Sequence, residues 1–170
     1  MPVGIVELLE GKPNDLSEVV LDLGGLPEFH RGVYEIARTI PAQRRLLLVG
    51  QAGDRSDEAI RALARAAWAL QPDRVVVKDM ETYLRGRLPG EVPGLLADEF
   101  LQLGLPGGAL SRVGPELEAV RTALEWARPD DLLVLAVHEN RRAVLDLFDQ
   151  LASTGWHAGD PLPGAPALRG

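Results

Sequence analysis

Short apolar runs alternate along the chain with longer segments in which apolar side chains recur at helical spacing. The runs have the length of β-strands, and they lie at Gly4–Leu9, Glu18–Leu23, Arg45–Gly50, Arg74–Lys78, Ala109–Val113 and Leu132–Val137. Two stretches, Leu46–Val49 and Val75–Val77, are apolar without interruption, which is typical of strands buried on both faces of a sheet. This alternation predicts an α/β fold with a mostly parallel sheet.

The segments between the runs carry the start and stop signals of helices. Helical spacing continues up to Pro41, which ends the first helix, and Ser56 or Asp57 can cap the next one. Further helices are predicted at Gly94–Leu103, from Pro115 onward and at Arg141–Ala152, whereas residues 79–93 are predicted to form a long polar loop. We expect one domain over residues 1–153 and an irregular or loosely attached tail, rich in proline and glycine, over 154–170.

Composition narrows the functions and the cellular locations that are expected for this domain. The chain has 170 residues and a net charge of −7, which argues against a general nucleic-acid-binding protein. No apolar run is long enough to cross a membrane and no signal peptide is recognisable, so we expect a cytoplasmic protein without a membrane partner. The chain has no cysteine and its 3 histidines are scattered, so neither a disulfide nor a metal site is expected.

Lysine is nearly absent, and this bias toward arginine suggests a GC-rich bacterial gene. Lys12 and Lys78 are the only lysines of the chain. A Walker-type phosphate loop needs a lysine directly after its last glycine and before Ser or Thr, and neither lysine stands in that setting. The sequence therefore predicts no phosphate loop within this chain.

Ligands of open α/β sheets bind beyond the carboxyl ends of the strands, where four loops of this chain are expected. These loops are Gly24–Pro27, Gly50–Asp57, Asp79–Pro93 and His138–Arg142. The second of them leads into a helix whose N-terminus favours an anion, but its acidic residues equally suit a well-capped turn.

Two other loops hold side chains that can bind an anion or act as a base. Arg85 and Arg87 flank Gly86, and a guanidinium there can hold a carboxylate or phosphate bidentately; the competing interpretation is an exposed loop with solvated arginines. His138 follows a predicted buried strand and can act as a base or a ligand, although such a histidine more often only ends the strand.

Four stretches, taken in order and spacing, match one family. Residues 52–61 contain Gly-Asp-Arg followed by Asp-Glu, residues 84–93 read Leu-Arg-Gly-Arg-Leu-Pro-Gly-Glu-Val-Pro, and residues 73–79 and 128–135 match the accompanying strands. Over roughly residues 17–150 the chain resembles the C-terminal domain of Mur ligases, most closely that of cyanophycin synthetases. The pair of Gly-Asp-Arg and Leu-Arg-Gly-Arg motifs is the specific part of this resemblance.

The resemblance implies a three-layer, Rossmann-like domain with a six-stranded, mostly parallel sheet. In the intact ligases a central domain carries the ATP-binding loop, ATP and Mg²⁺ convert a carboxylate into an acyl phosphate, and an amino group attacks it. The C-terminal domain closes over that site and helps to hold the amino acid and the nucleotide. Carried over by position, the residues on the amino-acid side are Asp54, Arg55, Arg85, Arg87 and Glu91, and those facing the nucleotide are Asp22, His138 and Glu139.

The resemblance thus implies the closing domain of an ATP-dependent amide ligase, inactive alone, which binds an amino acid and partners a central domain in the same chain or a separate subunit. No ATP or Mg²⁺ is expected to bind this domain by itself. The family's Asp-Tyr-Ala-His-x-Pro stretch corresponds to Asp22–Pro27, which lacks the aromatic residue and the histidine. That departure supports an alternative, a diverged stand-alone module for binding or assembly; a phosphate-binding protein and a homo-oligomer are also left open.

Overall fold

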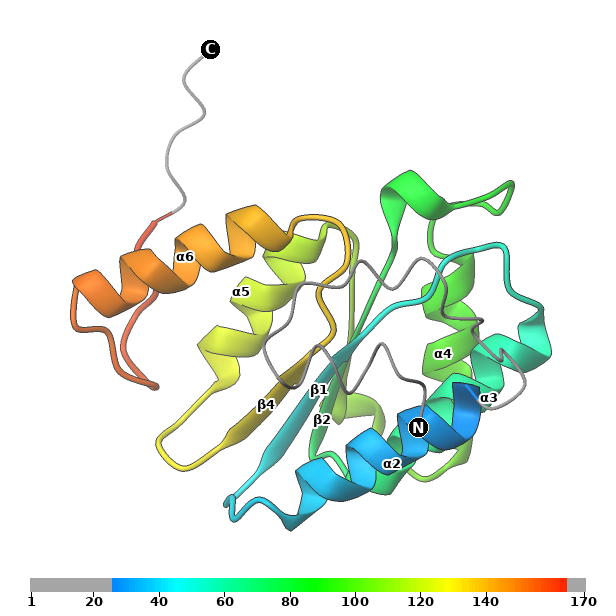
Figure 1. Cartoon of the computed structure of the whole chain (residues 1–170), viewed down its shortest axis with the longest axis horizontal. Helices are drawn as coiled ribbons and strands as arrows, with labels where there is room; N and C mark the ends of the chain where they lie inside the picture. Colours follow the sequence, from blue (N-terminus) through cyan, green and yellow to red (C-terminus); the bar gives the residue numbers. More distant parts are fainter. Residues whose placement is uncertain (1–25, 165–170) are drawn as a thin grey trace, which may run out of the picture.

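The structure is a computed structural model that describes residues 26–164, so the predictions for Gly4–Leu9, Glu18–Leu23 and Asp22 lie outside the described residues. Helices and strands alternate through this part (Figure 1). Their bounds are α2 Leu26–Thr39, β1 Arg45–Val49, α3 Asp57–Ala67, β2 Arg74–Lys78, α4 Glu91–Gln102, β3 Leu110–Val113, α5 Glu116–Trp126, β4 Leu132–Leu135 and α6 Arg141–Ser153. Three short 3₁₀ helices, η2 Trp68–Leu70, η3 Glu81–Tyr83 and η4 Gly107–Ala109, lie between them.

The strands form one parallel sheet with the order β3-β2-β1-β4. The prediction of an α/β fold with a parallel sheet flanked by helices is confirmed, but the described sheet has four strands and not six. Each of the four runs predicted within residues 26–164 contains a strand, and the other two runs precede Leu26. The prediction of six strands therefore needs correction for the described part of the chain.

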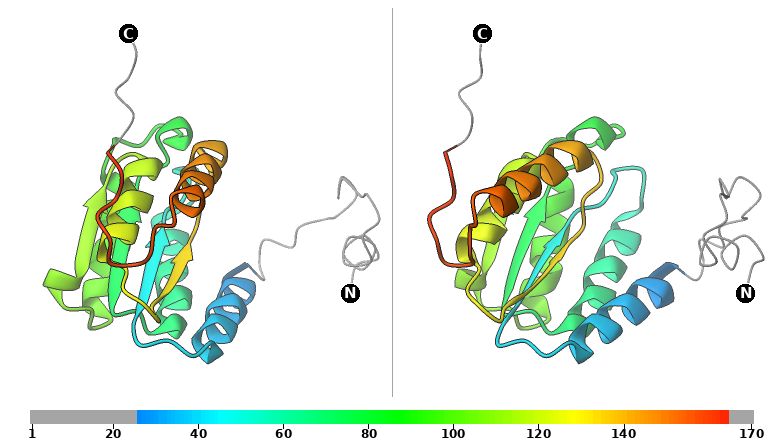
Figure 2. Two further views of the ribbon diagram at one scale, coloured as in Figure 1. Left: turned by 90° about the vertical axis from the view of Figure 1, so that its left-hand side faces the viewer. Right: turned by 60° about the vertical axis from the view of Figure 1, so that its left-hand side comes forward.

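Alternate residues of the strands bury two separate cores. Leu47, Val49, Val75 and Val77 pack with side chains of α2, α3 and α4 on one face. Leu46, Leu48 and Val76 pack with α5 and α6 on the other face. These residues are at most 1% exposed, as expected for strands that are apolar on both faces. The result is three layers, with α5 and α6 on one side of the sheet and α2, α3 and α4 on the other (Figures 1 and 2).

The order of the strands creates a switch point between β1 and β4. From β1 the chain moves outward through α3 to β2 and through α4 to β3, and it then returns through α5 to β4 on the other side of β1. Right-handed crossovers require the connecting helix to change faces when the direction of travel reverses, which is why α5 lies opposite α3 and α4. In such sheets, ligand sites favour the crevice beyond the carboxyl ends of the two strands at the switch point.

The predicted helix bounds need two corrections near residue 90. The predicted loop 79–93 contains η3, and α4 begins at Glu91 instead of Gly94. Gly90 has a φ of 85°, which turns the chain into the helix, and the Glu91 carboxylate accepts the backbone N–H of Leu88 at 3.1 Å. At α3 the prediction is confirmed: Ser56 is the N-cap, and its Oγ accepts the N–H of Ala59 at 3.2 Å.

Residues 154–164 contain no helix or strand, yet they contact the domain. Trp156 and Leu162 pack against the core shared by α5 and α6, and Arg121 donates a hydrogen bond of 2.6 Å to the carbonyl of Pro163. Within the described residues, every helix is too short or too polar to cross a membrane.

Candidate functional site

A cavity of about 200 Å³ lies at the switch point, under the carboxyl ends of β1 and β4. The lining residues come from both strand ends and from the two helices that cover them: His30, Val33, Tyr34, Val49, Gly50, Gln51, Leu63, Ala136 and His138. None of the described residues that line the cavity is Asp, Glu, Lys or Arg. The cavity is thus lined by apolar groups and by hydrogen-bonding groups without a formal charge.

A buried ion pair lies beside this cavity. Lys78 is the last residue of β2 and Glu116 the first of α5, and both side chains have no solvent exposure. The Lys78 Nζ atom lies 2.7 Å from the Glu116 carboxylate. Gly50 leaves room for the lysine, because a Cβ at that position would lie 3.0 Å from Lys78 Cγ. A larger residue at position 50 would therefore require Lys78 to shift by a few tenths of an ångström.

Glu116 also organises the loop that follows β4. Its carboxylate accepts the backbone N–H groups of His138, Glu139 and Asn140 at 2.7, 3.1 and 2.7 Å. Burial raises the pKa of Glu116, but hydrogen bonds from Lys78 and from this backbone outweigh burial and hold the pKa below its usual value. The charged carboxylate is therefore the form that holds the loop in place.

His138 is the member of this group that reaches the cavity. Its Nδ1 atom lies 3.3 Å from Lys78 Nζ, and because an ammonium group only donates, this contact favours the tautomer in which Nδ1 accepts. Burial and the charge of Lys78 lower the pKa of His138, against the opposing effect of Glu116 and Glu139. A neutral imidazole is thus held at the switch point, with Lys78 beside its Nδ1 atom.

We expect acid to destabilise the fold through His138. An unfolded His138 takes up a proton near pH 6.5, whereas the folded one does so only at lower pH, so the unfolded state binds more protons in this window. Stability should therefore fall as the pH drops below about 6.5, and His138→Gln should reduce that fall. Urea unfolding midpoints at about pH 7.5 and 5.5 measure this loss of stability. If His138→Gln loses as much stability as the wild type between these two pH values, the assignment to His138 is wrong.

Glu139, predicted to face the nucleotide, is occupied within the protein. Its carboxylate accepts the backbone N–H groups of Glu81 and Thr82 at 3.1 and 2.7 Å, and also the Thr82 hydroxyl. These contacts cap η3 and tie the loop after β2 to the loop after β4. Glu139 therefore positions the edge of the site.

Arg87 performs a similar internal role between the loops after β1 and β2. Its guanidinium donates to the carbonyls of Gly53 and Arg55 at 3.0 and 2.8 Å, and to the carboxylates of Asp57 and Glu91 at 2.7 and 2.6 Å. Hydrogen bonds to these two carboxylates raise the pKa of Arg87 above its usual value. With every guanidinium nitrogen engaged, Arg87 fixes loop geometry, as does its partner Glu91.

The other predicted residues lie on the outside of the same loops. Asp54 and Arg85 are exposed and Arg55 is half-buried. The Arg85 guanidinium carbon lies 5.3 Å from the centre of the Tyr83 ring, and the backbone of Arg85 adopts a left-handed φ of 51°. Among the described residues Arg85 has no ion-pair partner, which leaves its guanidinium able to bind an anion.

Metal-ligating side chains are not clustered within residues 26–164. No group of three or more His, Asp or Glu side chains within residues 26–164 could hold a metal ion. The carboxylates of Glu116 and Glu139 are occupied by backbone N–H groups, as shown above.

Sequence reasoning missed Lys78 and Glu116 as elements of the site. Lys78 does not stand in a phosphate-loop motif, but it directly follows the apolar run Val75–Val77. A lysine that ends a strand buried on both faces is the signal that could have found it. Glu116 follows Pro115 at a helix start, where a carboxylate is ordinary, and nothing local marks it as buried.

Comparisons with known proteins find no family model that matches this chain and no curated protein that matches it.

Proposed function

We propose that this chain is the closing, amino-acid-binding domain of an ATP-dependent amide ligase of the Mur and cyanophycin synthetase type. The observation that carries the proposal is the exposed Arg85, presented at the carboxyl edge of a doubly wound sheet on a loop that Arg87 and Glu91 brace. A guanidinium in such a place is suited to the carboxylate of an incoming amino acid. The motif resemblance supports the same assignment.

In this proposal the residues of the chain bind and orient. Arg85 binds the carboxylate of the amino acid, and the exposed Asp54 lies on the loop that Arg87 joins to the Arg85 loop, where it suits an ammonium group. ATP, bound elsewhere in the ligase with Mg²⁺, supplies the activated acyl group. Holding the amino acid in one orientation turns its attack into an effectively intramolecular step.

The remaining parts of the proposal concern the rest of the enzyme. The central ATP-binding domain is supplied by the same chain or a separate subunit, in the cytoplasm of a bacterium. A six-stranded sheet also belongs to this proposal, because two of its predicted strands precede Leu26.

Replacing Arg85 tests the proposal directly. In the ligase that carries this domain, Arg85→Ala should raise the KM for the amino acid about tenfold or more, because one charge-assisted contact is lost. Arg38→Ala is the control and should leave KM unchanged. Arg38 is exposed on α2 and lies near the amino end of β1, away from the carboxyl edge that holds Arg85. An unchanged KM in Arg85→Ala would rule out this role for Arg85, with thermal unfolding confirming that the variant is folded.

The alternative is a stand-alone module for binding or assembly. The observation that favours it is that Arg87, Glu91 and Glu139 have internal structural partners, so the fold retains them without any ligand. An immunoblot of source cells with an antibody to this domain separates the two proposals. A band of ligase size supports the closing domain, whereas a band near 18.4 kDa supports the module.

A further inference from the structure

The β4 edge of the sheet has the composition of an interior strand. Leu132–Leu135 is wholly apolar, yet all of its residues are only half-buried, whereas Leu46–Leu48 of the adjacent β1 are fully buried. Among the described strands, β4 pairs with β1 alone and leaves its other edge without a neighbour. Natural proteins avoid exposed apolar edge strands, because such edges pair with other chains.

Helix α2 presents an unpartnered apolar stripe in the same region. Val33 and Ile36 are 44% and 70% exposed, and Ile40 follows them directly after the helix. At about 100° per residue this stripe lies roughly a quarter of a turn from Tyr34 and Ala37, which contact the first core. A helix that contacts a neighbouring helix on one side normally faces its sheet a quarter of a turn away. Val33 lines the cavity at the carboxyl ends of β1 and β4, and the more exposed Ile36 continues the stripe away from that cavity.

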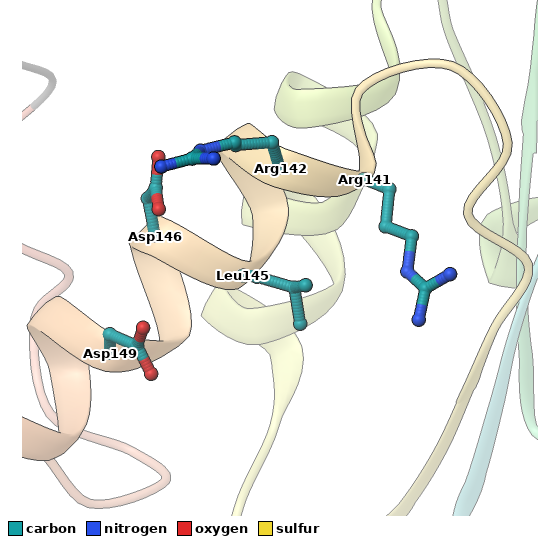
Figure 3. Close-up of a pocket in the computed structure, with 5 residues that line it drawn as sticks. All are labelled: Arg141, Arg142, Leu145, Asp146 and Asp149. Atoms are coloured by element: carbon teal, nitrogen blue, oxygen red, sulfur yellow. The ribbon is translucent and has the colours of Figure 1, made fainter.

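The opposite layer shows a matching exposed residue on α6. Leu145 is 50% exposed and lies in a surface hollow with Arg141, Arg142, Asp146 and Asp149. Figure 3 shows Arg142 turned toward Asp146, whereas Arg141 and Leu145 extend away from that pair. Exposed apolar side chains are thus found on α2, which covers one face of the sheet, and on α6, which covers the other. Arg141 is the first residue of α6, the end of the helix that follows β4.

The handedness of the crossovers identifies which occupant fits this edge. A strand beyond β4 that continued through α2 into β1 would travel in the same direction as β1 to β2. A right-handed connection then requires α2 to lie on the face that carries α3, and α2 does lie there. The apolar run Glu18–Leu23 ends just before Gly24 and Gly25, which suffice as a link to α2 at Leu26.

We propose that the surface formed by the β4 edge, Val33, Ile36 and Leu145 is the docking site for the segment Glu18–Leu23 of the same chain, added parallel to β4. Alternation would direct Val19, Leu21 and Leu23 to the stripe of α2, and Glu18, Val20 and Asp22 toward α6. The acidic side chains then meet the layer that carries Arg141 and Arg142. Because a parallel strand ends at the carboxyl edge, Asp22 is brought to the edge that holds His138. This inference does not depend on the proposed ligase role.

Crosslinking distinguishes this occupant from a second copy of the chain. The chain has no cysteine, so Leu21→Cys can be combined with Ile36→Cys and treated with a short bismaleimide. We expect a crosslink within one chain, at a rate independent of protein concentration and about tenfold or more above that of Leu21→Cys with Leu88→Cys. Leu88 is 74% exposed and lies in the loop just before α4, so it is the matched control. Equal rates for the two pairs, or links between chains whose rate grows with concentration, would overturn the proposal.

A charge substitution gives a second measurement in the full-length chain. Ile36→Glu should lower the denaturant midpoint, with the unfolding constant rising about tenfold, because it places a carboxylate against the docked segment. Leu88→Glu, at a site of similar exposure, should leave the midpoint unchanged. If both variants unfold at the wild-type midpoint, Ile36 faces solvent and the proposed docking is wrong.

Discussion

Lys78→Met is expected to lower the free energy of unfolding by about 4 kcal/mol. The substitution retains the apolar stem of the side chain, so it removes little packing. It leaves the Glu116 carboxylate fully buried with its three backbone partners but without its cation. A buried charge that loses its partner accounts for the cost. Urea unfolding at neutral pH, followed by tryptophan fluorescence, measures the loss.

The double variant Lys78→Met with Glu116→Gln is the control for this result. It removes both charges, so it should recover part of the stability that Lys78→Met loses, while the amide oxygen still accepts from the loop after β4. If Lys78→Met unfolds within about 1 kcal/mol of the wild type, the ion pair does not have the role described here.

Gly53→Ala should cost about 3 kcal/mol, the next largest effect that the structure predicts. A Cβ at this position would lie 2.0 Å from the carbonyl oxygen of Leu84, which belongs to the neighbouring loop and has no rotamer by which to move away. The loops after β1 and β2 would have to separate, and the hydrogen bond of 2.8 Å from Gly53 N–H to the Tyr83 carbonyl would be lost or lengthened.

A second glycine supplies the matched comparison. Gly32 lies within α2, and a Cβ there would have no heavy atom within 4 Å, so Gly32→Ala should raise the stability by about 0.5–1 kcal/mol. Chemical denaturation of both variants decides the matter. A Gly53→Ala variant as stable as Gly32→Ala would show that the two loops are not in contact as described.

Sequence patterns located the four described strands because each is a short, mainly apolar run, and in β1, β2 and β4 at least three apolar residues follow one another without interruption. The runs Leu46–Val49 and Val75–Val77 can be buried only by helices on both faces, which is what the structure shows. The start of α4 was misplaced because it depends on the positive φ of Gly90, and a glycine in a polar loop does not by itself reveal that conformation.

The candidate site was predictable in its location but only partly in the roles of its residues. Parallel strands bring their carboxyl ends together, so the loops after β1, β2 and β4 had to meet. Arg87 braces the loops whereas Arg85 is exposed to solvent, and this difference depends on the close approach of Gly53 to the neighbouring loop. That approach is a contact between segments distant in sequence. Local spacing carries no information about such an approach, and the two arginines looked equivalent.

The Lys78–Glu116 pair also affects which compact arrangements compete with the native one. The two charges come from β2 and α5, and the loop they hold follows β4, so three separately formed units must be docked correctly before each charge has its partners. If α5 were displaced by a single helical turn, both charges would be buried without partners, at a cost of several kcal/mol. The purely apolar cores would tolerate that displacement far better. We therefore expect the pair to widen the energy gap between the native register and its near neighbours, and so to contribute to the uniqueness of the fold.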